Sequence, residues 1–125
     1  MKGVLVDTSI WVEHFRNRST ELVSLLNQDR VFVHPMVMGE LACGTPPDRS
    51  KTLADLNDLQ HAQQPTFSEV IAFVNVHRLY GLGCGLVDMT LLASALLTGT
   101  ALWTLDKRLA ALANRMGVEF IPPVH

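Results

Sequence analysis

Short apolar runs recur along the chain, separated by longer stretches in which apolar residues fall three or four positions apart. Contiguous β-branched and apolar residues predict strands at four places, namely Val4–Val6, Val31–Val33, 101–104 and 118–121. The spacing between them is typical of helices that bury one face. Strands that alternate with helices predict an α/β domain, with a mainly parallel sheet of about four to five short strands between two layers of helices.

The helical stretches begin and end at residues that suit those places. The spacing predicts helices over 9–15, 19–28, 35–44, 48–60, 66–80, 88–99 and 107–115. Pro35 suits a first helical position, Thr66 and Glu69 have the spacing of a capping box, and Gly99 suits a C-cap. We expect the helices at 48–60 and 66–80 to pair as a hairpin that packs against another chain.

The first strand ends at an acid followed by two hydroxyls, Asp7, Thr8 and Ser9. All three residue types are good helix N-caps, so a cap is one explanation of this motif. Ligands of open α/β sheets, however, bind beyond the carboxyl ends of the strands, where Asp7 would lie. We therefore expect Thr8 or Ser9 to cap the helix and Asp7 to serve a site, provided that other acids reach the same edge.

Four of the twelve acids do have a route to that edge. Asp7 and Asp106 follow strands, Glu40 lies near the apolar face of the helix after the second strand, and Asp88 opens the helix that leads into the third. Parallel strands bring their carboxyl ends to one side of a sheet. Asp7, Glu40 and Asp106 should meet there, and Asp88 joins them if its helix begins at that end.

Carboxylates that crowd together must take up protons or hold a cation. A set of oxygen ligands without histidine or cysteine suits a hard ion, Mg²⁺ or Mn²⁺. Such an ion activates water and neutralises charge on a phosphodiester. The hydroxyls of Thr8, Ser9 and Thr104 are candidates to orient the carboxylates or their waters.

The composition limits the class of protein. A length of 125 residues predicts a single domain over 1–125, and 48% apolar residues suggest that another chain covers part of the surface. The net charge of −2 argues against a general nucleic-acid coat protein but allows a nuclease with a local basic patch.

The chain carries no sign of export or of a membrane span. Cys43 and Cys84 have no metal-ligand spacing and are expected to be free thiols in a reducing cytoplasm. Lys2 is followed by too few apolar residues for a secretory signal, and the apolar region 86–103 is interrupted by Asp88. We expect a cytoplasmic protein that has no contact with a membrane.

Four short motifs, in this order and at these separations, resemble those of one family. They are Val6-Asp7-Thr8-Ser9, Met38-Gly39-Glu40-Leu41, the stretch 88–95 that opens with Asp88, and Thr104-Leu105-Asp106. The chain resembles the PIN-domain ribonucleases and, within them, the VapC-like toxins of toxin–antitoxin pairs. The resemblance implies a metal-dependent endoribonuclease with Asp7, Glu40, Asp88 and Asp106 as its acids. It also implies a homodimer and inhibition by a small antitoxin protein.

Basic residues near these acids are candidates for contact with RNA phosphates. Lys107 and Arg108 adjoin Asp106, and they stand where some relatives have a further acid, so the resemblance implies a four-acid site. Arg16, at the end of the first helix, is a third candidate. Each of the three can also be an ordinary solvated charge, and Trp11 and Trp103 are expected to pack in the core.

Two other functions stay open. In an aspartyl-phosphate phosphatase a strand-end Asp7 would be the nucleophile, but these enzymes usually have a second acid two residues on, where this chain has Ser9. In a non-catalytic binding module the acids would only cap helices. The stability of such a module would not respond to Mg²⁺, whereas a crowded acidic site is stabilised when it binds the ion.

Overall fold

The computed structural model describes residues 2–124, and its centre is a parallel sheet. Within these residues the sheet has four strands in the order β3-β2-β1-β4, and every neighbouring pair is parallel. The strands are β1 (Val4–Val6), β2 (Val31–Val33), β3 (Gln60–His61) and β4 (Ala101–Trp103). All carboxyl ends therefore lie at one edge of the sheet, and the prediction of an α/β fold is confirmed.

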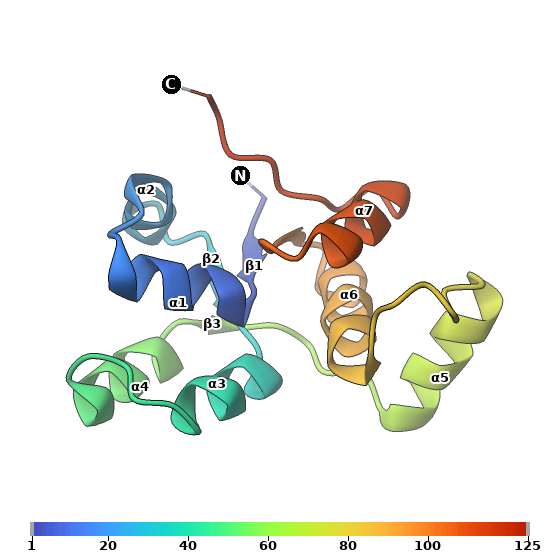
Figure 1. Ribbon diagram of the computed structural model, residues 1–125, viewed down its shortest axis with the longest axis horizontal. Helices are drawn as coiled ribbons and strands as arrows, with labels where there is room; N and C mark the ends of the chain where they lie inside the picture. Colours follow the sequence, from blue (N-terminus) through green and yellow to red (C-terminus); the bar gives the residue numbers. More distant parts are fainter. Residues whose placement is uncertain (1, 125) are drawn as a thin grey trace.

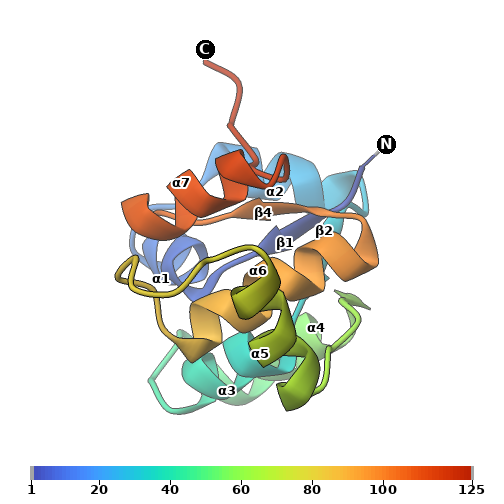
Figure 2. The same cartoon turned by 90° about the vertical axis from the view of Figure 1, so that its right-hand side faces the viewer.

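Helices lie on both sides of this sheet, as the two ribbon views show (Figures 1 and 2). They are α1 (Thr8–Arg16), α2 (Thr20–Asn27), α3 (Pro35–Ala42), α4 (Arg49–Asn57), α5 (Phe67–Val76), α6 (Leu86–Thr98) and α7 (Lys107–Arg115). In Figure 2, α2 and α7 lie above the strands and α3 and α4 below them. This is the predicted arrangement of a sheet between two helical layers.

The core forms where α6 packs against β1 and β4. All residues of these two strands are buried, and so is the continuous run 89–95 of α6. A helix that is buried around most of its surface needs such a run, because neighbours cover several of its faces. Trp11 and Trp103 are 2% and 7% exposed, which confirms that they pack in the core. No helix within residues 2–124 is long and apolar enough to cross a membrane.

Two edges of the sheet differ from the prediction. The segment 118–121 forms only an isolated bridge, between Glu119 and Leu102, because the prolines at 122 and 123 follow at once and donate no hydrogen bonds. At the other edge, β3 was missed because Gln60 and His61 are polar and exposed and have no apolar pattern. The helix predicted to run to residue 60 ends at Asn57 instead.

The predicted pairing of the two central helices is wrong. α4 packs on α3, and α5 packs on α6, at opposite ends of the molecule (Figure 1). The strand β3 causes the separation, because it joins the sheet beside β2 and carries the chain away from α4. Each of the two helices packs instead on its other neighbour in the sequence.

Candidate metal centre

Asp7 comes directly after β1, where its backbone begins α1. Its Oδ1 accepts a hydrogen bond of 2.7 Å from the backbone N–H of Thr8. Its Oδ2 accepts bonds from the hydroxyls of Thr104, at 2.6 Å, and Ser9, at 3.1 Å. The residue is 9% exposed, so these three donors replace the water that a buried carboxylate loses. Asp7 is itself the N-cap, and the prediction that Thr8 or Ser9 caps this helix is wrong.

The two hydroxyls beside Asp7 also tie β1 to β4. The Thr104 oxygen accepts from the N–H of Asp106, and the Ser9 oxygen accepts from the N–H of Leu105, each at 3.0 Å. Each hydroxyl has one proton and gives it to Asp7, so the 3.5 Å approach between the two hydroxyl oxygens is not a further hydrogen bond. The hydroxyls that donate to Asp7 are thus themselves positioned by hydrogen bonds from backbone N–H groups.

Asp106 is placed by the start of α7. Its Oδ1 accepts from the backbone N–H groups of Arg108, at 2.9 Å, and Leu109, at 3.0 Å, which makes it the N-cap. Both bonds end on the same oxygen, and Oδ2 takes no part in the cap. One acid therefore caps a helix through a single oxygen and leaves the other outside the cap.

Glu40 reaches the edge from α3. Its Oε1 accepts a 2.7 Å bond from the hydroxyl of Thr8, which joins α3 to the start of α1. The helix that carries it begins with Pro35 in the first turn and with His34 as N-cap, whose Nδ1 accepts from the N–H of Met36 at 3.0 Å. His34 is completely buried, and burial lowers its pKa. No local sequence pattern indicates this role for His34.

Asp88 is the third residue of α6, and its Oδ2 accepts from the N–H of Gly85 at 3.3 Å. Partial burial raises the pKa of Asp88, and the bond from Gly85 offsets part of that effect. Three further charges raise the pKa, those of Asp106, Asp7 and Glu40. The structure therefore brings all four acids within electrostatic reach of one another. Asp88 is among them, because its helix begins at the carboxyl edge of the sheet.

None of the four acids forms an ion pair with a side chain in the described residues. Within residues 2–124 the one ion pair joins Lys51 to Asp55, and neither residue belongs to this cluster. In the same part of the chain, no three histidine, cysteine, aspartate or glutamate side chains are arranged to hold one ion as they stand. In Asp7, Asp88 and Asp106 one carboxylate oxygen accepts from a backbone N–H, and each carboxylate keeps further lone pairs for an ion. The donor set itself, four carboxylates, fits a hard divalent cation.

Two of the predicted basic residues lie in the first turn of α7. Lys107 and Arg108 are both exposed. The side chain of Arg108 crosses the backbone of Gly83, where a Cβ atom would come within 2.6 Å of Nη1. Gly83 has φ +84°, a left-handed conformation that favours glycine, whereas the flexible end of Arg108 could move away from an added Cβ atom. Arg108 is thereby directed toward the loop that leads into α6 and Asp88.

The same loop brings Cys84 to the cluster, which the sequence did not predict. Burial raises the pKa of its thiol, and the charges of Asp88 and Asp106 raise it further. The third basic candidate, Arg16, lies elsewhere. It lines a groove that also includes Thr8 and Glu40 but not Arg108.

The chain matches known proteins along almost its whole length. Residues 4–115 match the PIN domain family. Two curated relatives, both named Ribonuclease VapC32, come from Mycobacterium tuberculosis strains CDC 1551 / Oshkosh and ATCC 25618 / H37Rv. Each is 45% identical over 122 residues, which cover 97% of this chain and 98% of the relative.

Solved structures share the fold at much lower identity. VapBC-1 from nontypeable Haemophilus influenzae has a TM-score of 0.70 at 14% identity, with 95% of this chain and 96% of that chain covered. DNA-bound VapBC from Salmonella typhimurium has a TM-score of 0.63 at 16% identity, with 87% and 90% covered.

A parallel sheet with acids gathered at its carboxyl edge is thus the fold of a PIN domain, and the chain belongs to that family. Within the family it belongs with the VapC ribonucleases, as the resemblance predicted. Nucleases of this kind are typically metal-dependent, in keeping with the donor set described above.

Proposed function

We propose that this chain is a Mg²⁺-dependent endoribonuclease that acts as the toxin of a toxin–antitoxin pair. The observation that carries the proposal is the cluster of Asp7, Glu40, Asp88 and Asp106 at one sheet edge. None of them forms an ion pair within the described residues, and burial, followed by the charges of the other three, raises the pKa of Asp88. Such a cluster is costly unless a cation binds to it.

The four acids are the proposed ligands of Mg²⁺, for which Mn²⁺ can substitute. Asp7 is the central ligand because it is fixed on the end of β1, and Asp106 joins it through Oδ2. Glu40 and Asp88 close around the ion from α3 and α6. When bound, the ion would neutralise charge on the scissile phosphodiester and make a water molecule more acidic.

Hydroxyl groups hold these carboxylates in position. Thr104 and Ser9 donate to Asp7, and Thr8 donates to Glu40. Such outer partners fix the direction of a ligand oxygen and raise its affinity for the ion. Thr104 also accepts from the backbone of Asp106, so one side chain aligns two ligands.

RNA is the proposed substrate, and a small antitoxin is the proposed protein partner. The relatives are named ribonucleases, and two of the solved neighbours are VapBC proteins. Lys107 and Arg108 adjoin Asp106 and are exposed, which suits contacts with RNA phosphates beside the acids.

Cleavage of RNA by the purified chain tests the proposal. We expect total cellular RNA to be cut internally when Mg²⁺ is present and to remain intact in EDTA. Expression in a bacterial host should arrest growth, and the protein encoded beside the chain should relieve the arrest. RNA cleavage that persists in EDTA would contradict the role of the ion, and growth that continues would contradict the role as a toxin.

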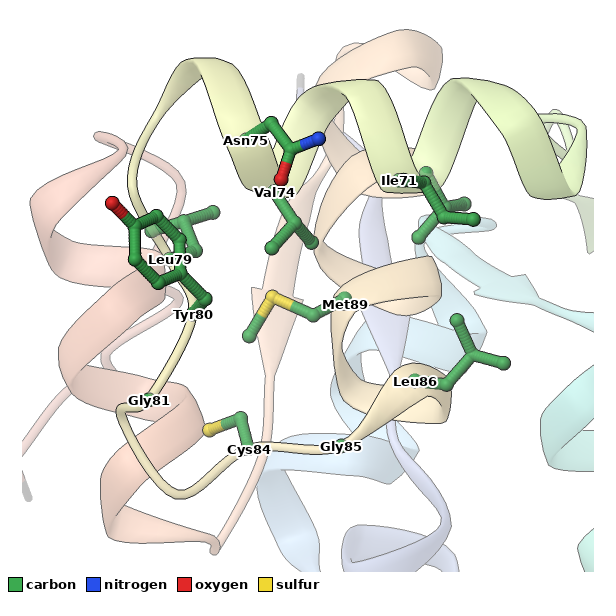
Figure 3. A pocket seen from close by; sticks show the side chains of 11 residues that line it. Ile71, Val74, Asn75, Leu79, Tyr80, Gly81, Cys84, Gly85, Leu86 and Met89 are labelled. Carbon is green, nitrogen blue, oxygen red and sulfur yellow. The ribbon is translucent and has the colours of Figure 1, made fainter.

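The chain is further proposed to form a homodimer through α5 and α6. An apolar cavity of about 340 Å³ lies between these helices, and none of its lining residues is charged (Figure 3). Ile71, Leu86 and Tyr80 remain 46%, 45% and 64% exposed there. Homodimer interfaces are more apolar than those of transient partners, which favours a second copy of the chain. Sedimentation of Ile71→Glu should give a monomer, whereas an intact dimer would exclude this face.

The phosphatase alternative has less support. Enzymes that use a strand-end aspartate as nucleophile usually have a second acid two residues on. This chain has Ser9 there, and its hydroxyl donates a hydrogen bond to Asp7. No phosphoryl adduct on Asp7 is therefore expected.

A further inference from the structure

A groove runs along the outer face of α1 and opens beside the acids. Its volume is about 410 Å³, and its walls come from α1, from α3 and from the loop that follows α3. Thr8 and Glu40, which are hydrogen-bonded to each other, lie in its wall. The groove is therefore continuous with the candidate metal centre.

The residues that α1 contributes have helical spacing, so they form one continuous wall. Thr8, Val12 and Arg16 follow one another at intervals of four positions, and all of them line the groove. At 1.5 Å per residue the wall extends about 12 Å from Thr8 to Arg16. It passes from the acidic edge to a basic side chain, with an apolar stretch between them.

The walls also offer apolar surface. Beyond Glu40, the side opposite α1 includes Leu41, Pro46 and Pro47, and Val12 on α1 is 37% exposed. Arg16 is exposed, and its guanidinium forms no ion pair with any of the described residues. An occupant that presents a flat apolar face and a negative charge would satisfy both features.

We propose that this groove binds an unpaired nucleoside of the RNA substrate, with the adjoining phosphate held by Arg16. The inference rests on the proposed ribonuclease function and adds a subsite to it. Single-stranded RNA is recognised through bases that leave the stack and pack on protein side chains, with backbone phosphates paired to cations. The nucleotide next to the one at the acids would then lie along α1, between Val12 and Pro46.

Binding of a short fluorescein-labelled RNA of random sequence tests the groove apart from cleavage. The titration is done in EDTA, where the proposed cleavage cannot proceed, over a series of salt concentrations. Arg16→Ala should weaken binding and lower the slope of log Kd against log salt by about 0.7, the value for one phosphate contact with a single strand. Arg18→Ala is the matched control, because it removes the same charge two residues away and outside the groove. It should leave the slope unchanged.

A second variant places a negative charge in the apolar part. Val12→Glu should weaken RNA binding more than Arg16→Ala does, while its thermal unfolding stays close to that of the parent chain because Val12 is on the surface. RNA that carries 4-thiouridine should crosslink to peptides from 8–16 and 44–47.

Three results overturn the subsite. One is RNA binding by both variants with the affinity and salt slope of the parent chain. Another is crosslinking confined to other segments. A third is loss of the antitoxin complex alone, with RNA binding intact, which would make the groove a protein-docking face. In each case the parent chain can still cleave RNA with Mg²⁺, so failure of the subsite is distinguishable from failure of the ribonuclease proposal.

Discussion

The two halves of the acidic edge are built differently. Asp7 and Asp106 follow β1 and β4, and the hydroxyls of Ser9 and Thr104 join them in one hydrogen-bonded network. Glu40 and Asp88 come from the helices α3 and α6. One hydrogen bond positions each of them: the Thr8 hydroxyl donates to Glu40, and the N–H of Gly85 donates to Asp88.

This difference separates the tasks of the two halves. The strand half is already ordered by the backbone, so it can define the position of an ion. The helix half carries the electrostatic strain, since the pKa of Asp88 is raised by burial and then by the other three acids. We expect changes in the strand half to affect activity most and changes in the helix half to affect stability and its dependence on the ion.

The largest effect is expected from Asp7→Asn. The variant keeps an oxygen for the N–H of Thr8 but removes the central charge of the site. The bound ion is expected to stabilise the transition state of cleavage by several kcal/mol. Loss of that stabilisation corresponds to a fall in the cleavage rate on the order of 10³-fold. Initial rates of RNA cleavage at saturating Mg²⁺ measure it, with Glu40→Gln expected to lose less.

Asp58→Asn is the control for this comparison, because Asp58 is exposed and lies at the end of α4. It should cleave RNA like the parent chain. If Asp7→Asn retained full activity, or if Glu40→Gln were the weaker enzyme, the strand half would not be the centre of the site.

A smaller effect is expected from Thr104→Val, which keeps the shape of the side chain and removes its hydroxyl. The variant loses the donor to Asp7 and the acceptor for the N–H of Asp106. The Mg²⁺ concentration for half-maximal cleavage should rise about 10- to 100-fold. Thr8→Val loses only the donor to Glu40 and should change it less. Equal shifts in the two variants would remove the distinction between the halves.

Mg²⁺ should stabilise the folded chain, and Asp88 should determine how much. At about 100 times Kd the ion adds about 2.7 kcal/mol to the free energy of unfolding. Without the ion, a raised pKa means that charged Asp88 destabilises the fold at neutral pH, since stability is lost as pH rises through that pKa. Asp88→Asn should therefore melt higher than the parent in EDTA and gain less from Mg²⁺. A lower melting temperature in EDTA would contradict the strain assigned to the helix half.

The sequence predicts the strand half well because local rules determine it. A buried strand that ends at Asp7 and a second that ends near Asp106 must reach the same edge of a parallel sheet. The sequence also identifies Thr8, Ser9 and Thr104 as candidate partners, although it does not tell which hydroxyl binds which acid. It assigned the cap of α1 to Thr8 or Ser9, since nothing local shows that Asp7 takes that place as well.

The helix half depends on packing that no local pattern contains. The place of Asp88 follows from α6, which joins β4 through residues 99 and 100 and therefore begins at the carboxyl edge of the sheet. The long connection before α6 includes β3, whose two exposed polar residues give no strand signal. The same strand separates α4 from α5 and makes the predicted hairpin wrong. Cys84 and Arg108 meet at the loop before α6 for a similar reason, because Gly83 admits the arginine side chain from a distant helix.

The smallest effect concerns His34, the buried N-cap that holds the start of α3 and with it Glu40. Burial lowers its pKa below the unfolded value of 6.5, so the unfolded chain binds more protons between the two values. Stability is then complete above pH 6.5 and falls below it, with a slope of at most about 1.4 kcal/mol per pH unit. His34→Asn keeps a capping oxygen for the N–H of Met36 and does not titrate, so its free energy of unfolding should fall less between pH 7.5 and 5.5.

His14, whose pKa is also lowered by burial, contributes to the loss of stability in the same direction, and His14→Gln measures that contribution. If His34→Asn retained the full slope, proton uptake by His34 would not limit the stability of the helix that carries Glu40.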